Sequence, residues 1–136
     1  GYQRAMEEAG LEKYISLVQE NTFGKDREVA LRIKSHEINP TAAFIFSDEI
    51  SVGVMKSASA HCIKIPRDLS IVGFDDLSYA SMVYPSLTTI AQPKYEIGVY
   101  AAQRIIALIE GKEALEELVL EPELVIRHST APLKVR

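Results

Sequence analysis

The segment from Ser70 to Asp76 constrains the fold more than any other part of this chain. It is a short apolar run that stops abruptly at two carboxylates, Asp75 and Asp76. An apolar run of strand length is typical of a parallel strand buried on both faces, and the carboxyl ends of such strands are where α/β proteins bind ligands. A second strand-like segment, Thr88–Ala91, follows a turn-prone Pro-Ser pair and stops before Pro93. Together these segments indicate a ligand-binding α/β domain.

Apolar periodicity along the chain predicts an alternation of helices and strands. The longest helix is expected from Tyr95 to Glu110, ended by Gly111. The expected elements are, in order, a helix over 2–9, a strand around 15–18, a helix around 29–33, a strand over 42–46, a helix over 50–58 capped by Ser47-Asp48-Glu49, strands over 69–74 and 88–91, the helix over 95–110, and an edge strand within 119–127. Such an alternation implies parallel pairing with right-handed crossovers, and therefore a doubly wound α/β sheet.

Size and charge fit one ordinary globular domain. The chain has 136 residues, of which 47% are hydrophobic and 25% charged, a normal balance for a folded protein. Its formal net charge is −4 and it contains no long basic run. Such a surface repels a phosphate backbone, so this segment by itself is not expected to bind nucleic acid.

The cysteine content and the N-terminal sequence indicate the kind of compartment in which the protein works and whether the chain is complete. The single cysteine, Cys62, allows neither an internal disulfide nor a cysteine metal cluster, which fits a reducing compartment. No apolar stretch is long enough to span a membrane, and the N-terminus does not resemble a signal peptide. The chain opens on Gly1-Tyr2, directly in a helical pattern and without an initiator methionine. We therefore expect it to be a fragment of a longer protein.

Candidate site residues follow directly on predicted strands: Phe23, Ser47, Asp48 and Asp75. Because parallel strands point the same way, these residues are expected to gather at one edge of the sheet. Carboxylates accept hydrogen bonds from sugar hydroxyls and an aromatic ring covers an apolar ligand face, so the set suits a small polyol. Structural roles remain open: Ser47 or Asp48 as a helix N-cap, Asp76 as a cap of the next segment, and Phe23 as a core plug.

Enzyme signatures are scarce in this sequence. It has no nucleophile elbow, phosphate-binding glycine loop or dinucleotide fingerprint. Its three histidines are scattered without a second ligand at metal spacing, so no metal or cofactor is expected. An acid/base pair formed by Asp48 and Asp75 is an alternative, but nothing in the sequence marks either as a general acid or base. A phosphate-receiver domain needs its acidic pair after the first strand, whereas here that pair comes late. We expect a binding protein, not an enzyme.

The order of several motifs is similar to that of the LacI/GalR family of bacterial transcription regulators, over essentially the whole chain. The matching segments are Gly1-Tyr2…Ala5-Met6…Ala9-Gly10, Ala42–Asp48…Gly53, Pro66-x-Asp68–Asp76, Pro85-x-Leu87–Ile90-x-Gln92-Pro93, and Leu124–Arg127-x-Ser129.

The resemblance implies a two-lobed, periplasmic-binding-protein-like (type I) effector domain, here incomplete. It implies effector contacts by Asp75, by Ser47 with the neighbouring Asp48, and by stacking of Phe23. It also implies a homodimer, with an interface formed by Val52, Met55, Met82 and Val83. By lobe, residues 1–92 resemble the C-terminal lobe, residues 93–120 a segment crossing into the N-terminal lobe, and residues 121–136 the return. The helix in the crossing segment is then expected to expose an apolar face, or to hide it in an oligomer or a swapped arrangement.

Three departures from the family pattern matter. The family usually has asparagine where Ser47 stands, which shortens the reach of that side chain. It usually has glycine where Cys62 stands, so a left-handed conformation there is expected to carry a steric cost. The DNA-binding helix-turn-helix and the first half of the effector domain have no counterpart in this chain.

The function expected from the sequence is effector binding and dimerisation within a sugar-responsive, cytoplasmic transcription repressor. Its partners are then a sugar or related metabolite, a second copy of the chain, and operator DNA reached only through a separate N-terminal domain, with no membrane partner. The alternative is a periplasmic sugar-binding protein of the same fold. The Arg127-x-Ser129 ending and the Thr88–Ile90 strand favour the regulator.

Overall fold

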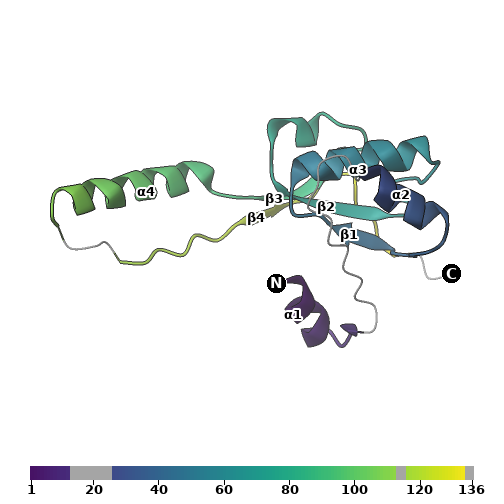
Figure 1. The fold of residues 1–136 in the computed structure, drawn as a ribbon, viewed down its shortest axis with the longest axis horizontal. Coiled ribbons are helices and arrows are strands. Elements are labelled where there is room, and N and C mark those ends of the chain that lie inside the picture. The colour runs from purple at the N-terminus through teal and green to yellow at the C-terminus, as the bar shows by residue number, and fades with distance from the viewer. Residues whose placement is uncertain (13–25, 113–115, 134–136) are drawn as a thin grey trace.

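A computed structural model describes residues 1–12, 26–112 and 116–133 of the chain (Figure 1). The strand expected around 15–18 and the candidate ligand contact Phe23 lie outside the described residues. The remaining expected elements are present, with bounds that differ by a few residues. In chain order they are α1 (Tyr2–Glu8), α2 (Asp26–Lys34), β1 (Ala42–Phe44), α3 (Asp48–Ala60), β2 (Ser70–Asp75), the 3-10 helix η2 (Ser78–Ser81), β3 (Thr88–Ala91), α4 (Lys94–Ile109) and β4 (Glu123–Val125).

The four described strands form one sheet in the order β1-β2-β3-β4. β1, β2 and β3 pair in parallel, and β4 pairs antiparallel with β3 through Thr89↔Val125 and Ala91↔Glu123. An antiparallel edge strand on an otherwise parallel sheet is common in doubly wound folds. The expected α/β class and the expected edge strand are both confirmed.

The core lies between α3 and one face of the sheet. Val54 and Met55 of α3 are buried against Leu69, Ile71 and Leu87. α3 begins at Asp48 because the Ser47 hydroxyl accepts a hydrogen bond from the Glu49 amide at 3.2 Å. This bond satisfies one of the free donors of the first turn. α2 packs on α3, so these two helices cover the same side of the sheet.

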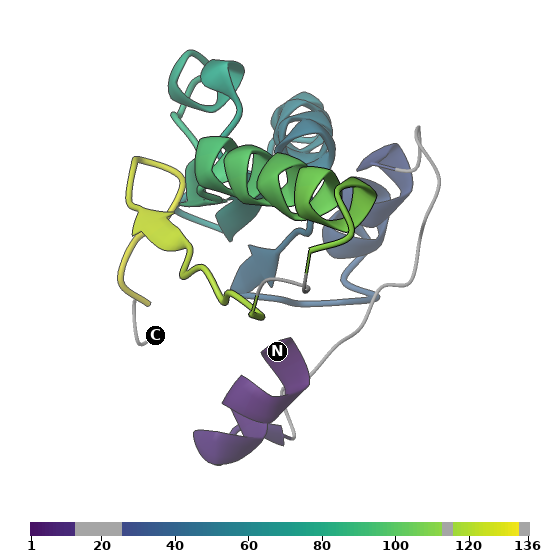
Figure 2. The ribbon, with the colours of Figure 1, turned by 90° about the vertical axis from the view of Figure 1, so that its left-hand side faces the viewer.

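The other face of the sheet is less well covered in the described part of the chain. Register places Phe44 beside Val72 and Phe74 beside Ile90, and their side chains point away from α3 because neighbours alternate along a strand. Phe44 remains 52% exposed and meets Phe74 edge to face, with 6.5 Å between ring centroids. Figure 2 shows α1 standing clear of the other helices, and α1 has no buried residue. This face is therefore apolar but mostly open.

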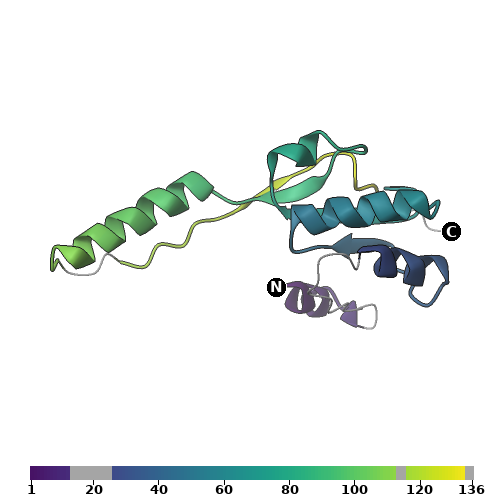
Figure 3. The same cartoon turned by 45° about the horizontal axis from the view of Figure 1, so that its top comes forward.

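Helix α4 projects away from the sheet at the end of two extended segments (Figures 1 and 3). Its buried residue is Ala107, whereas Tyr95 is 80% and Ile109 is 79% exposed. The Tyr100 hydroxyl donates a hydrogen bond to the backbone carbonyl of Glu116 on the returning segment. The expected apolar exposure of this helix is confirmed, and it means that α4 has a face suited to packing against another surface.

A buried carboxylate fastens the beginning of α3 to the sheet. Asp48 is fully buried. Its Oδ1 accepts a hydrogen bond from the Thr89 hydroxyl at 2.6 Å, and its Oδ2 accepts one from the Leu77 amide at 2.8 Å. Gly73 of β2 leaves room for this arrangement, because a Cβ built there would lie 2.3 Å from Asp48 Oδ1 and 3.0 Å from Leu87 Cδ2.

Replacing Gly73 with alanine is therefore expected to destabilise the protein. The added methyl group has to displace the Asp48 carboxylate from Thr89, and we expect the free energy of unfolding to fall by roughly 1–3 kcal/mol, as for other overpacked cores. Urea unfolding of the full-length protein measures this change. Gly98→Ala is the matched control: Gly98 lies inside α4 with no atom within 4 Å of the added Cβ, so we expect a gain of up to about 1 kcal/mol. Equal effects at both sites would contradict the steric role of Gly73.

The C-terminus of α3 has the geometry expected at Cys62. Cys62 has a φ of 64°, in the left-handed region. The Ile63 amide donates to the Ala58 carbonyl at 2.9 Å, and the Cys62 amide donates to the Ser59 carbonyl at 3.1 Å. These bonds form a Schellman motif, in which glycine is preferred at the left-handed residue because a Cβ is disfavoured there.

Cys62→Gly is thus expected to raise the free energy of unfolding by about 1 kcal/mol, since it removes the left-handed penalty. A shift in the urea midpoint of the full-length protein measures it. Cys62→Ala removes the thiol but keeps the Cβ, and is expected to bring no such gain. Stabilisation by both substitutions would instead assign the effect to loss of the thiol.

Candidate functional site

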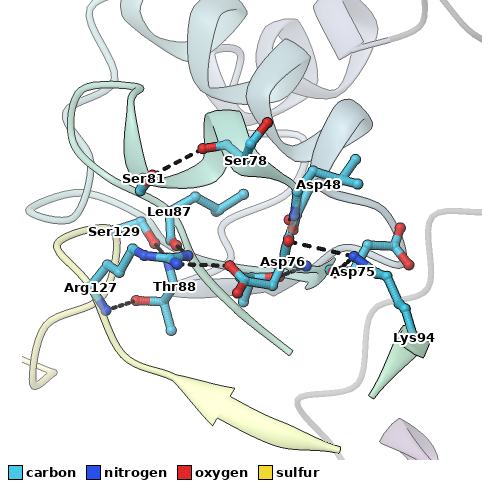
Figure 4. Close-up of polar contacts among 12 residues, drawn as sticks. Asp48, Asp75, Asp76, Ser78, Ser81, Leu87, Thr88, Lys94, Arg127 and Ser129 are labelled. Atoms are coloured by element: carbon cyan, nitrogen blue, oxygen red, sulfur yellow. Dashed lines mark hydrogen bonds and ion pairs between the residues drawn. The ribbon is translucent and has the colours of Figure 1, made fainter. Parts of the chain in front are cut away.

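The candidate site lies where the parallel strands end. Asp75 is the last residue of β2, Ser47 follows the end of β1, and Gln92 follows β3 directly. Because β1, β2 and β3 are parallel, all three residues belong to the carboxyl edge of the sheet. Figure 4 shows Asp48, Asp75, Asp76 and Lys94 grouped near this edge.

Asp75 is held in an unusual backbone conformation. Its φ is 115°, beyond the ordinary left-handed region. For a residue with a Cβ such a conformation costs on the order of 1–3 kcal/mol and persists only where the surroundings impose it. Its half-buried carboxylate accepts a hydrogen bond from the Gln92 side-chain amide at 2.7 Å, and its backbone carbonyl accepts one from the Lys94 ammonium group. Strain of this kind is typical of functional sites.

The next residue, Asp76, also has a positive φ, 50°. Its Oδ1 lies 2.7 Å from Nη2 of Arg127, and both side chains are partly shielded from solvent. The interpretation of Asp76 as a cap of the following segment is wrong. η2 begins after Leu77, and no side chain caps it. Asp76 instead binds a residue 51 positions further along the chain.

The structure separates the roles of Ser47 and Asp48. Ser47 is the N-cap of α3 and remains partly exposed, so a capping role and a ligand contact are compatible for it. Asp48 is fully buried, with both carboxylate oxygens bound within the chain. A carboxylate with no exposed oxygen does not fit the expected effector contact, and the geometry gives Asp48 a structural role.

Tyr79 lies among carboxylates beside this edge. Burial raises the pKa of the Tyr79 hydroxyl, and three nearby carboxylates raise it further, those of Glu49, Asp48 and Asp75. Tyr79 lines an open surface depression together with Glu49, Val52 and Leu77. An ionised phenol is therefore disfavoured there, and the surroundings suit neutral hydrogen-bond donors such as hydroxyl groups.

Sequence reasoning missed the side chains that hold the site in shape. In the sequence, Gln92 stands out only as part of a family motif, and no pattern singles out Lys94. Arg127 was noted as part of a family motif without a contact. Its sequence position gives no signal of the pairing with Asp76, because that pairing depends on the antiparallel register of β3 and β4.

The candidate interface residues differ in exposure. Met82 is 78% exposed, whereas Val52 and Val83 are partly buried and pack on the core. Met55 is only 6% exposed and belongs to the core cluster. Its burial does not fit the expected interface role, because little of its surface remains for a partner.

The described residues also show what other kinds of site they lack. Among residues 1–12, 26–112 and 116–133, no helix is both long and apolar enough to cross a membrane. The same residues contain no cluster of three or more His, Cys, Asp or Glu side chains able to hold a metal ion.

Comparison with known proteins agrees with the fold. A family model described as "Periplasmic binding protein-like domain" matches residues 1–130. The HTH-type transcriptional regulator DegA of Bacillus subtilis (strain 168) is 40% identical over 136 residues, which cover 98% of this chain and 40% of DegA. The ribose operon repressor of Haemophilus influenzae is 38% identical, with 98% of this chain and 41% of the repressor covered. The chain thus spans about two fifths of the length of these relatives.

Solved structures lead to the same conclusion. A LacI family transcriptional regulator from Enterococcus faecium, solved with bound ribose, superposes with a TM-score of 0.82 at 27% identity, covering 98% of this chain and 50% of that one. The resemblance drawn from the sequence motifs is therefore confirmed. The chain belongs to the periplasmic-binding-protein-like domain family, in the form carried by LacI/GalR-family transcription regulators.

Proposed function

We propose that this chain is the effector-binding and dimerising part of a sugar-responsive transcription repressor. The observation that carries the proposal is the partly exposed Asp75 carboxylate, presented by a strained turn at the carboxyl edge of the sheet. The relatives that match are transcription regulators, so a periplasmic sugar-binding protein is not favoured. The whole protein then works in the cytoplasm and catalyses no reaction.

The effector in this proposal is a sugar or a related polyol. Carboxylate and hydroxyl oxygens accept hydrogen bonds from sugar hydroxyls, and Asp75 and Ser47 offer one of each kind at the same edge. A regulator that superposes on this chain was solved with ribose, which supports a sugar as the effector. Phe23 remains a predicted stacking partner, on residues that the structure does not describe.

Binding would act on the two lobes of the effector domain. In this proposal, residues 1–92 and 121–136 belong to the C-terminal lobe and residues 93–120 cross into the N-terminal lobe. The projecting α4, with its exposed apolar face, supports that division. An effector that binds one arrangement of the lobes better than the other shifts the population toward it. A separate N-terminal domain would bind operator DNA. The shift between the two arrangements of the lobes would then lower or raise its affinity for the operator.

The effector class is testable with the full-length protein. We expect one class of sugar or polyol to raise the melting temperature in a thermal-shift panel that also contains sugar phosphates and purines. A ligand at a concentration about 100-fold above its Kd stabilises the protein by about 2.7 kcal/mol. Stabilisation by purines alone would replace the sugar in this proposal, and stabilisation by none of these compounds would contradict it.

Asp75→Ala is expected to weaken the affinity of that effector by about 10- to 100-fold, the loss of a hydrogen bond to a charged group. Asp75→Asn keeps the size and tolerates a positive φ, so it is expected to retain part of the affinity. Isothermal titration of the full-length protein measures both. Asp68→Ala is the control, because Asp68 lies just before β2, at the opposite end of the same strand. Unchanged affinity of Asp75→Ala would remove Asp75 from the site.

The homodimer in this proposal uses the outer surface of η2 and of α3. Met82 and Tyr84 support it, because both are large apolar side chains left exposed on either side of the partly buried Val83. Large apolar side chains exposed together are typical of contact surfaces.

Met82→Glu is expected to shift the full-length protein from dimer toward monomer, because it places a charge in an apolar interface. Sedimentation velocity measures the shift. Leu133→Glu is the control, since Leu133 is 69% exposed on the C-terminal tail, and it is expected to leave the dimer intact. A dimer that survives Met82→Glu at low micromolar concentration would place the interface elsewhere.

A further inference from the structure

Residues from both sides of the excursion through α4 bind the Asp75–Asp76 turn. Before it, Gln92, directly after β3, binds the Asp75 carboxylate, and Lys94, the first residue of α4, binds the Asp75 backbone carbonyl. After it, Arg127, two residues beyond β4, binds the Asp76 carboxylate. The same turn therefore contacts the effector edge, the start of α4 and the chain that follows β4 (Figure 4).

Arg127 is fixed from several directions at once. Its Nη2 lies 2.7 Å from Asp76 Oδ1, and its Nη1 donates to the Leu87 carbonyl at 2.9 Å. Its backbone amide donates to the Thr88 hydroxyl, also at 2.9 Å. Its side chain is only 18% exposed. A shielded guanidinium with two separate acceptors is held rigidly, and lysine reproduces its charge but not its planar fork.

The turn needs such external support. Asp75 and Asp76 have φ values of 115° and 50°, and neither is glycine. Consecutive residues in these conformations persist only when their surroundings hold them. Asp76 is bonded directly to Asp75, so a shift of Asp76 changes the direction in which the Asp75 carboxylate points.

We propose that Arg127 is a positioning residue for the effector site: through its ion pair with Asp76, it holds the strained turn so that the Asp75 carboxylate faces the effector. This inference rests on the proposed function, since it gives Asp75 the effector contact. It assigns a role in effector recognition to a residue on the returning segment, more than 50 positions from Asp75 in the chain.

The test measures effector affinity by isothermal titration of the full-length protein with the stabilising sugar found in the thermal-shift panel. We expect Arg127→Met to weaken affinity by about tenfold or more, and Arg127→Lys to recover part of that loss. Arg67→Met is the matched control. Arg67 also pairs with a neighbouring aspartate, Asp68, at 2.9 Å, but this pair is more exposed and lies at the opposite end of β2, so its loss is expected to change affinity by less than about twofold.

A double-mutant cycle separates positioning from simple stabilisation of the fold. If Arg127 acts through the Asp75 carboxylate, Arg127→Met costs less affinity once that carboxylate is absent. We therefore expect its effect to shrink below about threefold in the Asp75→Asn background. Equal losses in both backgrounds would overturn the inference and leave Arg127 as a structural residue.

Asp76→Asn provides an independent variant if Arg127→Met does not fold. It removes the charge of the pair but keeps the size of the side chain and its tolerance of positive φ. We expect it to weaken effector affinity by about fivefold or more. Urea unfolding is expected to show that the variant is still folded in the buffer of the binding assay. Unchanged affinity would overturn the inference. The inference fails alone if Asp75→Ala loses affinity but Asp76→Asn does not, whereas the proposed function itself fails if Asp75→Ala binds normally.

Discussion

The buried carboxylate of Asp48 is the interaction on which the rest of this structure depends. It joins three elements at one point: the beginning of α3, the Thr89 hydroxyl of β3 and the Leu77 amide after β2. A fully buried carboxylate is costly unless its oxygens are hydrogen-bonded, and here both oxygens are. The arrangement requires Gly73, because a side chain on β2 would occupy the space of the carboxylate. It ties the first turn of α3 to β3 and to the chain that follows β2.

That rigid junction allows the neighbouring turn to remain strained. Asp75 ends β2 and Asp76 follows it, both with positive φ values. Gln92 after β3, Lys94 at the start of α4 and Arg127 after β4 hold them. Strain at a ligand site persists when the surrounding structure supplies enough fixed contacts. In this chain those contacts come from residues on both sides of the excursion through α4. Lys94 belongs to α4 itself, so the turn is tied directly to the helix that projects from the sheet.

Much of the fold was predictable from apolar periodicity and end signals. β2, β3, α3 and α4 lie within a few residues of the expected ranges, because each carries a strong apolar pattern and a clear stop signal. The left-handed Cys62 and the exposed apolar face of α4 were also expected correctly. The assignments of Asp48 to the effector site and of Met55 to the interface do not fit the structure. Sequence shows that a residue follows a strand or lies on a helix, but not which way its side chain points.

The sequence by itself determined the α/β class, the strand order along the chain, the family and the placement of Asp75 at the end of a buried strand. These features depend on local patterns and on motif order, which are read without contacts. Only the tertiary structure decided three contacts. Asp48 accepts a hydrogen bond from Thr89 inside the protein, Asp76 forms an ion pair with Arg127, and Gln92 donates a hydrogen bond to the Asp75 carboxylate. Each of these bonds joins residues 17 to 51 positions apart. Their partners are set by sheet register and by the direction of the turn, which no local pattern specifies.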